Sequence, residues 1–87
     1  MSEETLLEFP CQFPIKAMGR LDIEFDLLVI ELIRPHVDDL DLSTVKSRPS
    51  SSGTYLAVTV TIEALSKKQL DAIYQSLSDH PLVLMAL

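Results

Sequence analysis

The sequence predicts an α+β domain built from a four-stranded antiparallel sheet with two helices on one face. Residues 54–64 alternate strictly between apolar and mostly polar side chains, which is typical of a strand buried on one side. Ser66 and Gln69 then form a Ser-x-x-Gln capping box, the usual start of a helix. The short apolar run 82–87 follows His80-Pro81 and favours a final strand. Together these features predict a strand, helix and strand in the second half of the chain.

The first half predicts the same succession of elements. Alternating apolar residues from Phe13 indicate a first strand that ends at a turn near Gly19. A helix follows, with Asp22 as its predicted N-cap and Pro35 at its end or at a kink. Residues 42–48 form a weak predicted strand, and residues 49–53 close it as a hairpin loop.

Apolar positions at helical spacing identify the buried stripe of each predicted helix. The second helix adds a hydrophobic staple, in which Leu65 is expected to meet Leu70. We expect both stripes to fill the core, because helices this apolar most simply pack against a sheet. The stripes are Phe25, Leu28, Leu32 and Ile33 in the first helix, and Leu70, Ile73, Tyr74 and Leu77 in the second.

The element order β-α-β-β-α-β is that of the ferredoxin-like split βαβ fold. Right-handed crossovers place the first and third strands in the centre of the sheet. The second and last strands then lie at the edges, where unpaired backbone groups are able to recruit another chain. We expect residues 1–11 to be a flexible lead-in and residues 12–87 to form the single domain.

Composition narrows the functional classes. With 87 residues, the chain has room for a modest core and little for a deep cavity. Its net charge of −6 disfavours general nucleic-acid binding, since the whole-molecule field repels phosphates. Cys11 is the only cysteine, which fits a reducing cytoplasm. The longest apolar stretch, residues 27–33, is interrupted by Glu31 and too short to cross a bilayer, so we expect no membrane partner.

Several short segments in a fixed order carry a family resemblance that runs from about Leu7 to Leu87. Together they resemble the YbeD family of small uncharacterised bacterial proteins. The resemblance implies a ferredoxin-like fold similar to ACT domains, which are small-molecule sensing modules, and it implies no catalytic residues. The chain departs from the family pattern at Ser52, where a basic residue is expected, so an anion contact at the hairpin tip is not expected. The segments are Leu7-Glu-Phe-Pro10, Lys16, Met18-Gly19, Val45-Lys46, Pro49-Ser-Ser, Gly53-x-Tyr55 and Met85-Ala-Leu87.

The sequence offers no set of catalytic residues. No nucleophile–base pair, paired carboxylates or phosphate-binding loop can be placed, so we expect a non-enzymatic protein without metal or cofactor. His36 and His80 lack the spacing of metal ligands on one helix face and read as ordinary surface or helix-end residues. Cys11 reads as a half-buried small residue instead of a reactive thiol.

The sheet face that the helices leave uncovered is the first candidate site. Alternation places several basic residues there, with Arg20 at the margin, and such a charge split is able to orient docking onto an acidic protein. An ordinary solvated face is the equally weighted alternative, and an RNA-binding sheet would need more aromatic residues than Tyr55. The residues predicted on this face are Lys16, Met18, Thr44, Lys46, Arg48, Tyr55, Thr59 and Thr61.

Two hypotheses follow from these observations. The first is a small cytoplasmic regulatory or protein-interaction domain that acts through the open sheet face or an edge strand, with a homodimer as one candidate assembly. The alternative is an ACT-like sensor that binds an amino acid or related metabolite at the strand–helix turn of Gly19 and Arg20. For Gly19 the simpler interpretation is a glycine required by turn geometry, and the acidic residues that follow it would repel an anion.

Overall fold

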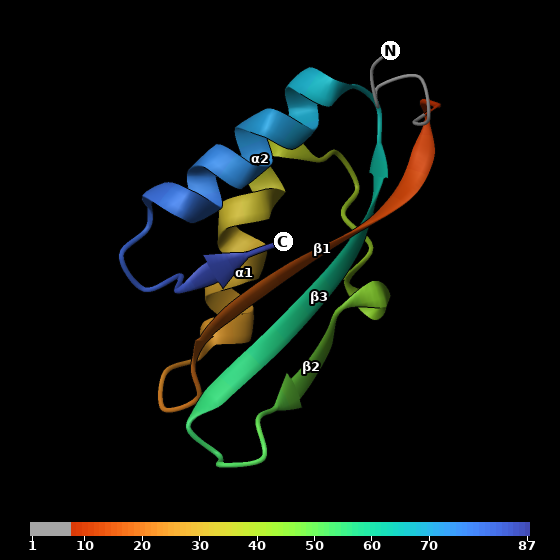
Figure 1. Ribbon diagram of the computed structural model, residues 1–87. Helices are drawn as coiled ribbons and strands as arrows, with labels where there is room; N and C mark the ends of the chain where they lie inside the picture. Colours follow the sequence, from red (N-terminus) through yellow and green to blue (C-terminus); the bar gives the residue numbers. More distant parts are fainter. Residues whose placement is uncertain (1–7) are drawn as a thin grey trace.

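A computed structural model describes residues 8–87 and confirms the predicted βαββαβ order (Figure 1). All neighbouring strands pair antiparallel in the order β2-β3-β1-β4, so the first and third strands are central as expected. Two short 3-10 helices, η2 and η3, lie between α1 and β2. The elements are β1 (Cys11–Arg20), α1 (Phe25–Ile33), η2 (Arg34–His36), η3 (Leu42–Thr44), β2 (Lys46–Pro49), β3 (Tyr55–Ala64), α2 (Lys67–Asp79) and β4 (Met85–Ala86).

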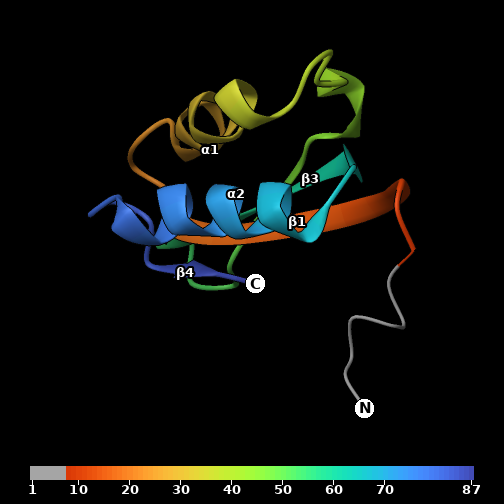
Figure 2. The same cartoon turned by 90° about the horizontal axis from the view of Figure 1, so that it is seen from above.

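Both helices lie on the same face of the sheet, as the view from above shows (Figure 2). The core fills the space between the helices and the two central strands. These strands pair along their whole length, from Cys11 opposite Ala64 to Arg20 opposite Tyr55. The largest side chains that are fully buried in this core are Ile15, Val58 and Val60 from the sheet, and Phe25, Val29, Ile33, Ile73 and Leu77 from the helices.

The start of α2 confirms the predicted capping box. The hydroxyl of Ser66 accepts the backbone N–H of Gln69 at 3.1 Å. The side-chain oxygen of Gln69 accepts the N–H of Leu65 at 2.7 Å, one residue before the cap. The Leu65 side chain is still 60% exposed, so the predicted staple buries little of it. The cap therefore fixes where α2 begins mainly through its hydrogen bonds.

The start of α1 differs from the prediction. The helix begins at Phe25, and the residue at its N-cap position is Glu24, which makes no side-chain capping bond. Asp22, predicted as the cap, instead accepts hydrogen bonds from the Arg20 guanidinium. An oppositely charged side chain two residues away competes successfully for this carboxylate. α1 ends at Ile33, shortly before Pro35, as the proline predicts.

The boundaries of three strands also differ from the prediction. Leu42–Thr44 forms η3 because Asp41 accepts the N–H of Ser43 at 3.0 Å and caps it, so β2 begins only at Lys46. β4 covers two of the six residues predicted for the last strand. Of the predicted lead-in, residues 1–7 lie outside the described part, Phe9 packs against the core and Cys11 already belongs to β1. Within residues 8–87, no helix has the length and apolar character needed to span a membrane.

Candidate functional site

The open face of the sheet is ordered in rows that run across the strands. In one row, Lys46 of β2 lies opposite Thr59 of β3, and Thr59 lies opposite Lys16 of β1. Leu87 continues the row, because its backbone N–H and O form hydrogen bonds of 2.7 and 3.1 Å with the O and N–H of Lys16. Residues that pair directly across antiparallel strands project their side chains from the same face. Two cations and one exposed leucine therefore share this row.

The neighbouring row is mostly apolar. Arg48 of β2 lies opposite Ala57, Ala57 lies opposite Met18, and Met18 lies opposite Met85 of β4. Met85 is 51% exposed. Tyr55 stands two residues further along β3, opposite Arg20. Across both rows and this pair, the structure brings together six of the eight residues predicted on the open face: Lys16, Met18, Lys46, Arg48, Tyr55 and Thr59.

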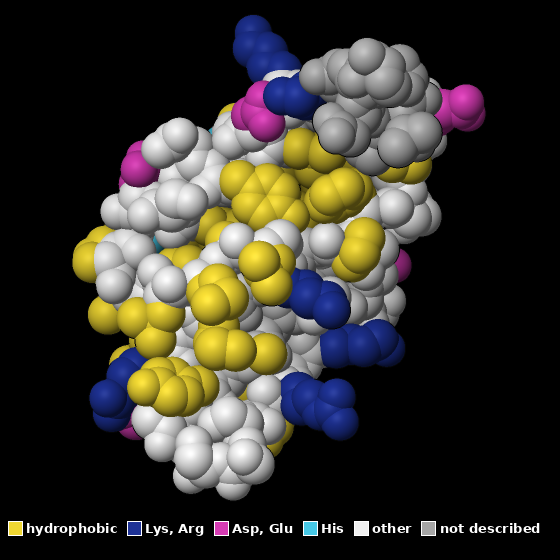
Figure 3. All heavy atoms as spheres, in the orientation of Figure 1, with side chains coloured by type: hydrophobic (Ala, Val, Ile, Leu, Met, Phe, Trp, Pro, Cys, Tyr) yellow, Lys and Arg dark blue, Asp and Glu magenta, His cyan; other side chains and the backbone are white. Residues whose placement is uncertain are grey.

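Charge on this face is opposite in sign to the charge of the whole protein. Lys16, Lys46 and Arg48 are exposed there, whereas the net charge of the chain is −6. The four strands contain a single acidic residue, Glu63, which pairs with Gln12 away from these cations. Figure 3 shows a group of Lys and Arg side chains on the β2 side of a band of hydrophobic side chains, further Lys and Arg side chains at the top and at the lower left of the view, and Asp and Glu at the margins.

A shallow apolar hollow lies within this hydrophobic band. Its volume is about 90 Å³. The short side chain of Ala57 stands between Arg48 and Met18 in its row and so leaves a depression between longer neighbours. The residues that line the hollow are Lys16, Ala17, Met18, Ala57, Met85 and Leu87. Of these, Leu87 is 69% exposed, so apolar surface is offered to solvent beside the cations.

Thr44, which was also predicted on the open face, lies elsewhere. It belongs to η3, and its hydroxyl is 2.8 Å from the backbone O of Asp41 and 3.0 Å from that of Thr61. The hydroxyl therefore attaches η3 to β3. Thr61 remains on the open face by register, beyond Thr59 along β3.

The predicted ligand turn at Gly19 and Arg20 is already occupied by the protein's own side chains. Gly19 lies inside β1, and a Cβ built there would stand 2.4 Å from the Phe25 ring. Close packing, and not turn geometry, therefore requires glycine. Arg20 pairs with Asp22 at 2.9 Å, and this hydrogen bond lowers the pKa of the Asp22 carboxyl and raises that of Arg20. The Phe25 ring therefore packs directly against the Gly19 backbone on the core side of β1.

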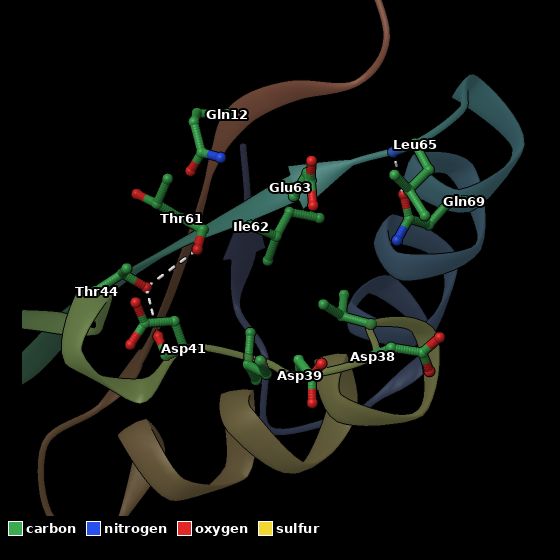
Figure 4. Close-up of a pocket in the computed structure, with 12 residues that line it drawn as sticks. Gln12, Asp38, Asp39, Asp41, Thr44, Thr61, Ile62, Glu63, Leu65 and Gln69 are labelled. Atoms are coloured by element: carbon green, nitrogen blue, oxygen red, sulfur yellow. Dashed lines mark hydrogen bonds between the residues drawn. The ribbon is translucent and has the colours of Figure 1, made fainter.

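A second hollow, which the sequence did not predict, lies at the other end of the molecule (Figure 4). Its volume is about 370 Å³, and its lining includes the carboxylates of Asp38, Asp39, Asp41 and Glu63. The acidic run 38–41 was visible in the sequence, but only the fold brings Glu63 beside it. Four acidic side chains in the lining disfavour an anionic ligand in this hollow. Among the described residues, no group of three His, Cys, Asp or Glu side chains is arranged to hold a metal ion.

Both histidines make hydrogen bonds within the fold, and the cysteine packs against the core. His36 Nε2 lies 2.9 Å from the Ser76 hydroxyl, and this contact joins the segment after α1 to α2. His80 Nδ1 accepts the N–H of Leu82 at 3.2 Å in the turn before β4. Cys11 is half-buried and packs against the core.

The fold and its surfaces define a small ferredoxin-like α+β domain with one uncovered, basic and apolar sheet face. The family model described as "Protein of unknown function (DUF493)" matches residues 4–87, so the chain belongs to the DUF493 family. A UPF0250 protein of Nitrosomonas europaea is 46% identical over 87 residues, and one of Chromobacterium violaceum is 48% identical over 89 residues, with full coverage of both chains in each case. These matches confirm the YbeD-family resemblance.

The fold is shared with a solved structure of another protein. The solution structure of protein HP0495 from H. pylori superposes with a TM-score of 0.75, covering 100% of this chain and 94% of that one. Sequence identity between the two is 14%, so the likeness concerns the fold alone.

Proposed function

We propose that this protein is a non-enzymatic, cytoplasmic interaction domain whose open sheet face binds an acidic segment of another protein. The observation that carries the proposal is the grouping of Lys16, Lys46 and Arg48 beside exposed apolar side chains on a protein of net charge −6. The cytoplasmic location is supported by Cys11, which is the only cysteine and is free.

Charge and apolar area have separate roles in this proposal. Complementary charges steer encounter and fix orientation more than they add affinity. Apolar side chains at the centre of an interface supply most of the favourable free energy once water is excluded. Arg20 is excluded from the cation group because Asp22 already neutralises it.

The open face is a better binding surface than the β2 edge. β2 is only four residues long, and it ends at Pro49, which has no backbone N–H to donate to an added strand. Lys46 and Arg48 also place charge on this edge, a common protection against strand addition. A second copy is a poorer occupant of the face than an acidic partner, because it would bring the same three cations against their own counterparts.

The test compares two charge-reversed double variants in affinity capture from lysate. The face variant is Lys46→Glu with Arg48→Glu, and the matched control is Lys67→Glu with Lys68→Glu at the start of α2. Both variants carry the same charge change, but the control residues are exposed on a helix that packs on the other face of the sheet. The expected result is an acidic protein that wild type and control retain and the face variant loses.

The captured protein is then purified and titrated against the same three proteins at increasing salt concentration. Binding to wild type is expected to weaken with salt, because exposed charges are screened. Equal binding by the face variant and the wild type would refute the proposed surface.

A further inference from the structure

We propose that the 90 Å³ hollow on the open face receives one aliphatic side chain of an acidic partner segment, with the partner carboxylates beside it toward β2. This inference rests on the proposed function and specifies the chemistry of the partner. Small-molecule pockets occupy about 300–1,000 Å³, so a hollow of this size suits one side chain better than a metabolite.

The lining of the hollow has the character of an anchor site. Its walls include Met18 and Met85, whose unbranched and polarizable side chains adapt to different aliphatic shapes. Ala57 lies between Met18 and Arg48, where its small size provides the depression. An aliphatic side chain placed there would cover apolar surface that solvent now contacts.

The basic residues around the hollow determine which side chains of the partner segment lie next to the aliphatic anchor. Lys16 belongs to the lining itself, and Arg48 is the direct cross-strand neighbour of Ala57. Lys46 stands one row away, opposite Thr59. The cations thus stand in the β1 wall of the hollow and on its β2 side, and the described residues of β4 bring none, so an anchor with Asp or Glu on the side that faces β2 complements the surface in charge. A purely polyanionic ligand would leave the apolar lining exposed.

The experiment uses the full chain and two short synthetic peptides of identical net charge. Both peptides are acidic, and they differ only at one central position, which is Leu in one and Ser in the other. Fluorescence anisotropy measures binding to wild type, to the Lys46→Glu, Arg48→Glu variant and to Ala57→Leu. The Ala57→Leu substitution fills the hollow without changing charge. Met85→Ala provides a second uncharged variant in case Ala57→Leu perturbs the strand.

The Leu peptide is expected to bind wild type about tenfold or more tightly than the Ser peptide, as burial of one leucine predicts. Ala57→Leu and Met85→Ala are expected to reduce this preference, and the charge variant to weaken both peptides. With ¹³C-methyl methionine, the signals of Met18 and Met85 are expected to shift with the Leu peptide far more than with the Ser peptide.

The outcomes separate the two proposals. Equal binding of both peptides, with loss only in the charge variant, would overturn the anchor while leaving the proposed function standing. Binding that neither the charge variant nor the hollow variants change would overturn both. If the peptides bind nothing and the protein self-associates through this face in sedimentation, the occupant is a second copy and the inference is wrong.

Discussion

Gly19 is the residue where close packing most clearly requires a glycine. A Cβ at this position would lie 2.4 Å from the Phe25 ring, which is fully buried. We expect Gly19→Ala to lower the free energy of unfolding by about 1–3 kcal/mol, since overpacking forces the ring or the strand to move. Urea denaturation measures the change.

Gly53→Ala is the control, because Gly53 has a φ of +76° and no atom within 4 Å of a built Cβ. Its cost arises only from the left-handed backbone, about 1 kcal/mol. Phe25→Leu is expected to recover part of the loss in Gly19→Ala and none of the loss in Gly53→Ala. Independent, additive effects of the Gly19 and Phe25 substitutions would contradict the packing explanation.

Ionisation of Asp41 makes the stability of the fold depend on pH. Two hydrogen bonds from Ser43, chiefly from its hydroxyl at 2.6 Å and then from its N–H at 3.0 Å, lower the pKa of the Asp41 carboxyl. A group with a lowered folded-state pKa stabilises the fold above its unfolded pKa of about 3.9 and loses that contribution as pH falls through the folded pKa. NMR titration of the Asp41 carboxyl carbon is expected to give a pKa below the ordinary value, and Ser43→Ala is expected to raise it. An unchanged pKa in Ser43→Ala would contradict this assignment.

The sequence predicted a structural role for Gly19 and for Asp22, but both predicted roles, a turn glycine and a helix N-cap, were wrong. A glycine before a helix favours a turn, and an acid before a helix favours an N-cap. Neither pattern reveals that Phe25 packs back onto β1, or that Arg20 captures Asp22. Both outcomes depend on contacts that form only after the elements have packed.

The beginning of α2 depends on one side chain with two functions. The Gln69 oxygen accepts the N–H of Leu65, and its nitrogen donates to the backbone O of His36 at 2.9 Å. This residue therefore joins the α2 cap to η2. We expect Gln69→Ala to cost about 1–3 kcal/mol, because one exposed and one half-buried hydrogen bond are lost together. Thermal or urea unfolding measures this loss.

Gln75→Ala is the matched control on the same helix. The Gln75 amide contacts only the exposed Asp79 carboxylate among the hydrogen bonds found for it, so the expected change is within about 0.5 kcal/mol. Equal losses in the two variants would show that Gln69 acts through general helix propensity and not through its two bonds.

The long elements were predictable and the short ones were not. β3 has a clear two-residue alternation of buried and exposed side chains, and α2 has helical spacing together with an N-cap. Both elements formed where expected. In contrast, residues 42–44 became η3 because Asp41 offered a local cap that competes with strand pairing. β4 is limited to Met85–Ala86, the two positions paired with Ala17 and Met18. Short apolar runs carry too little periodic signal to set such boundaries.

The candidate site was predictable in part. Alternation alone placed seven of the eight predicted residues correctly on the open face, because register in a one-sided sheet follows the hydrophobic pattern. The hollow was not predictable, since it requires Met85 and Leu87 to lie beside Met18 and Lys16 from the opposite end of the chain. The charge contrast between the face and the whole protein was predicted from the same alternation, and the pairing of β1 with β3 and of β3 with β2 determines which cations are neighbours.

Because the cations and the apolar hollow are different parts of one face, we expect them to control different rate constants of binding. Lys46 and Arg48 act at a distance and orient an acidic partner, so their reversal is expected mainly to lower the association rate and its salt dependence. Ala57→Leu changes only short-range contacts, and it is expected mainly to raise the dissociation rate. Stopped-flow mixing of the Leu peptide with each variant measures both rates.

The Lys67→Glu, Lys68→Glu protein tests whether position or total charge controls the association rate. It has the same net charge as the face variant, but its substitutions lie on the helix face of the molecule. A local basic face predicts a much smaller decrease in association rate for this control. Equal decreases in the two variants would instead mean that the partner responds to the net charge of the whole protein, and that the open face has no special role in steering.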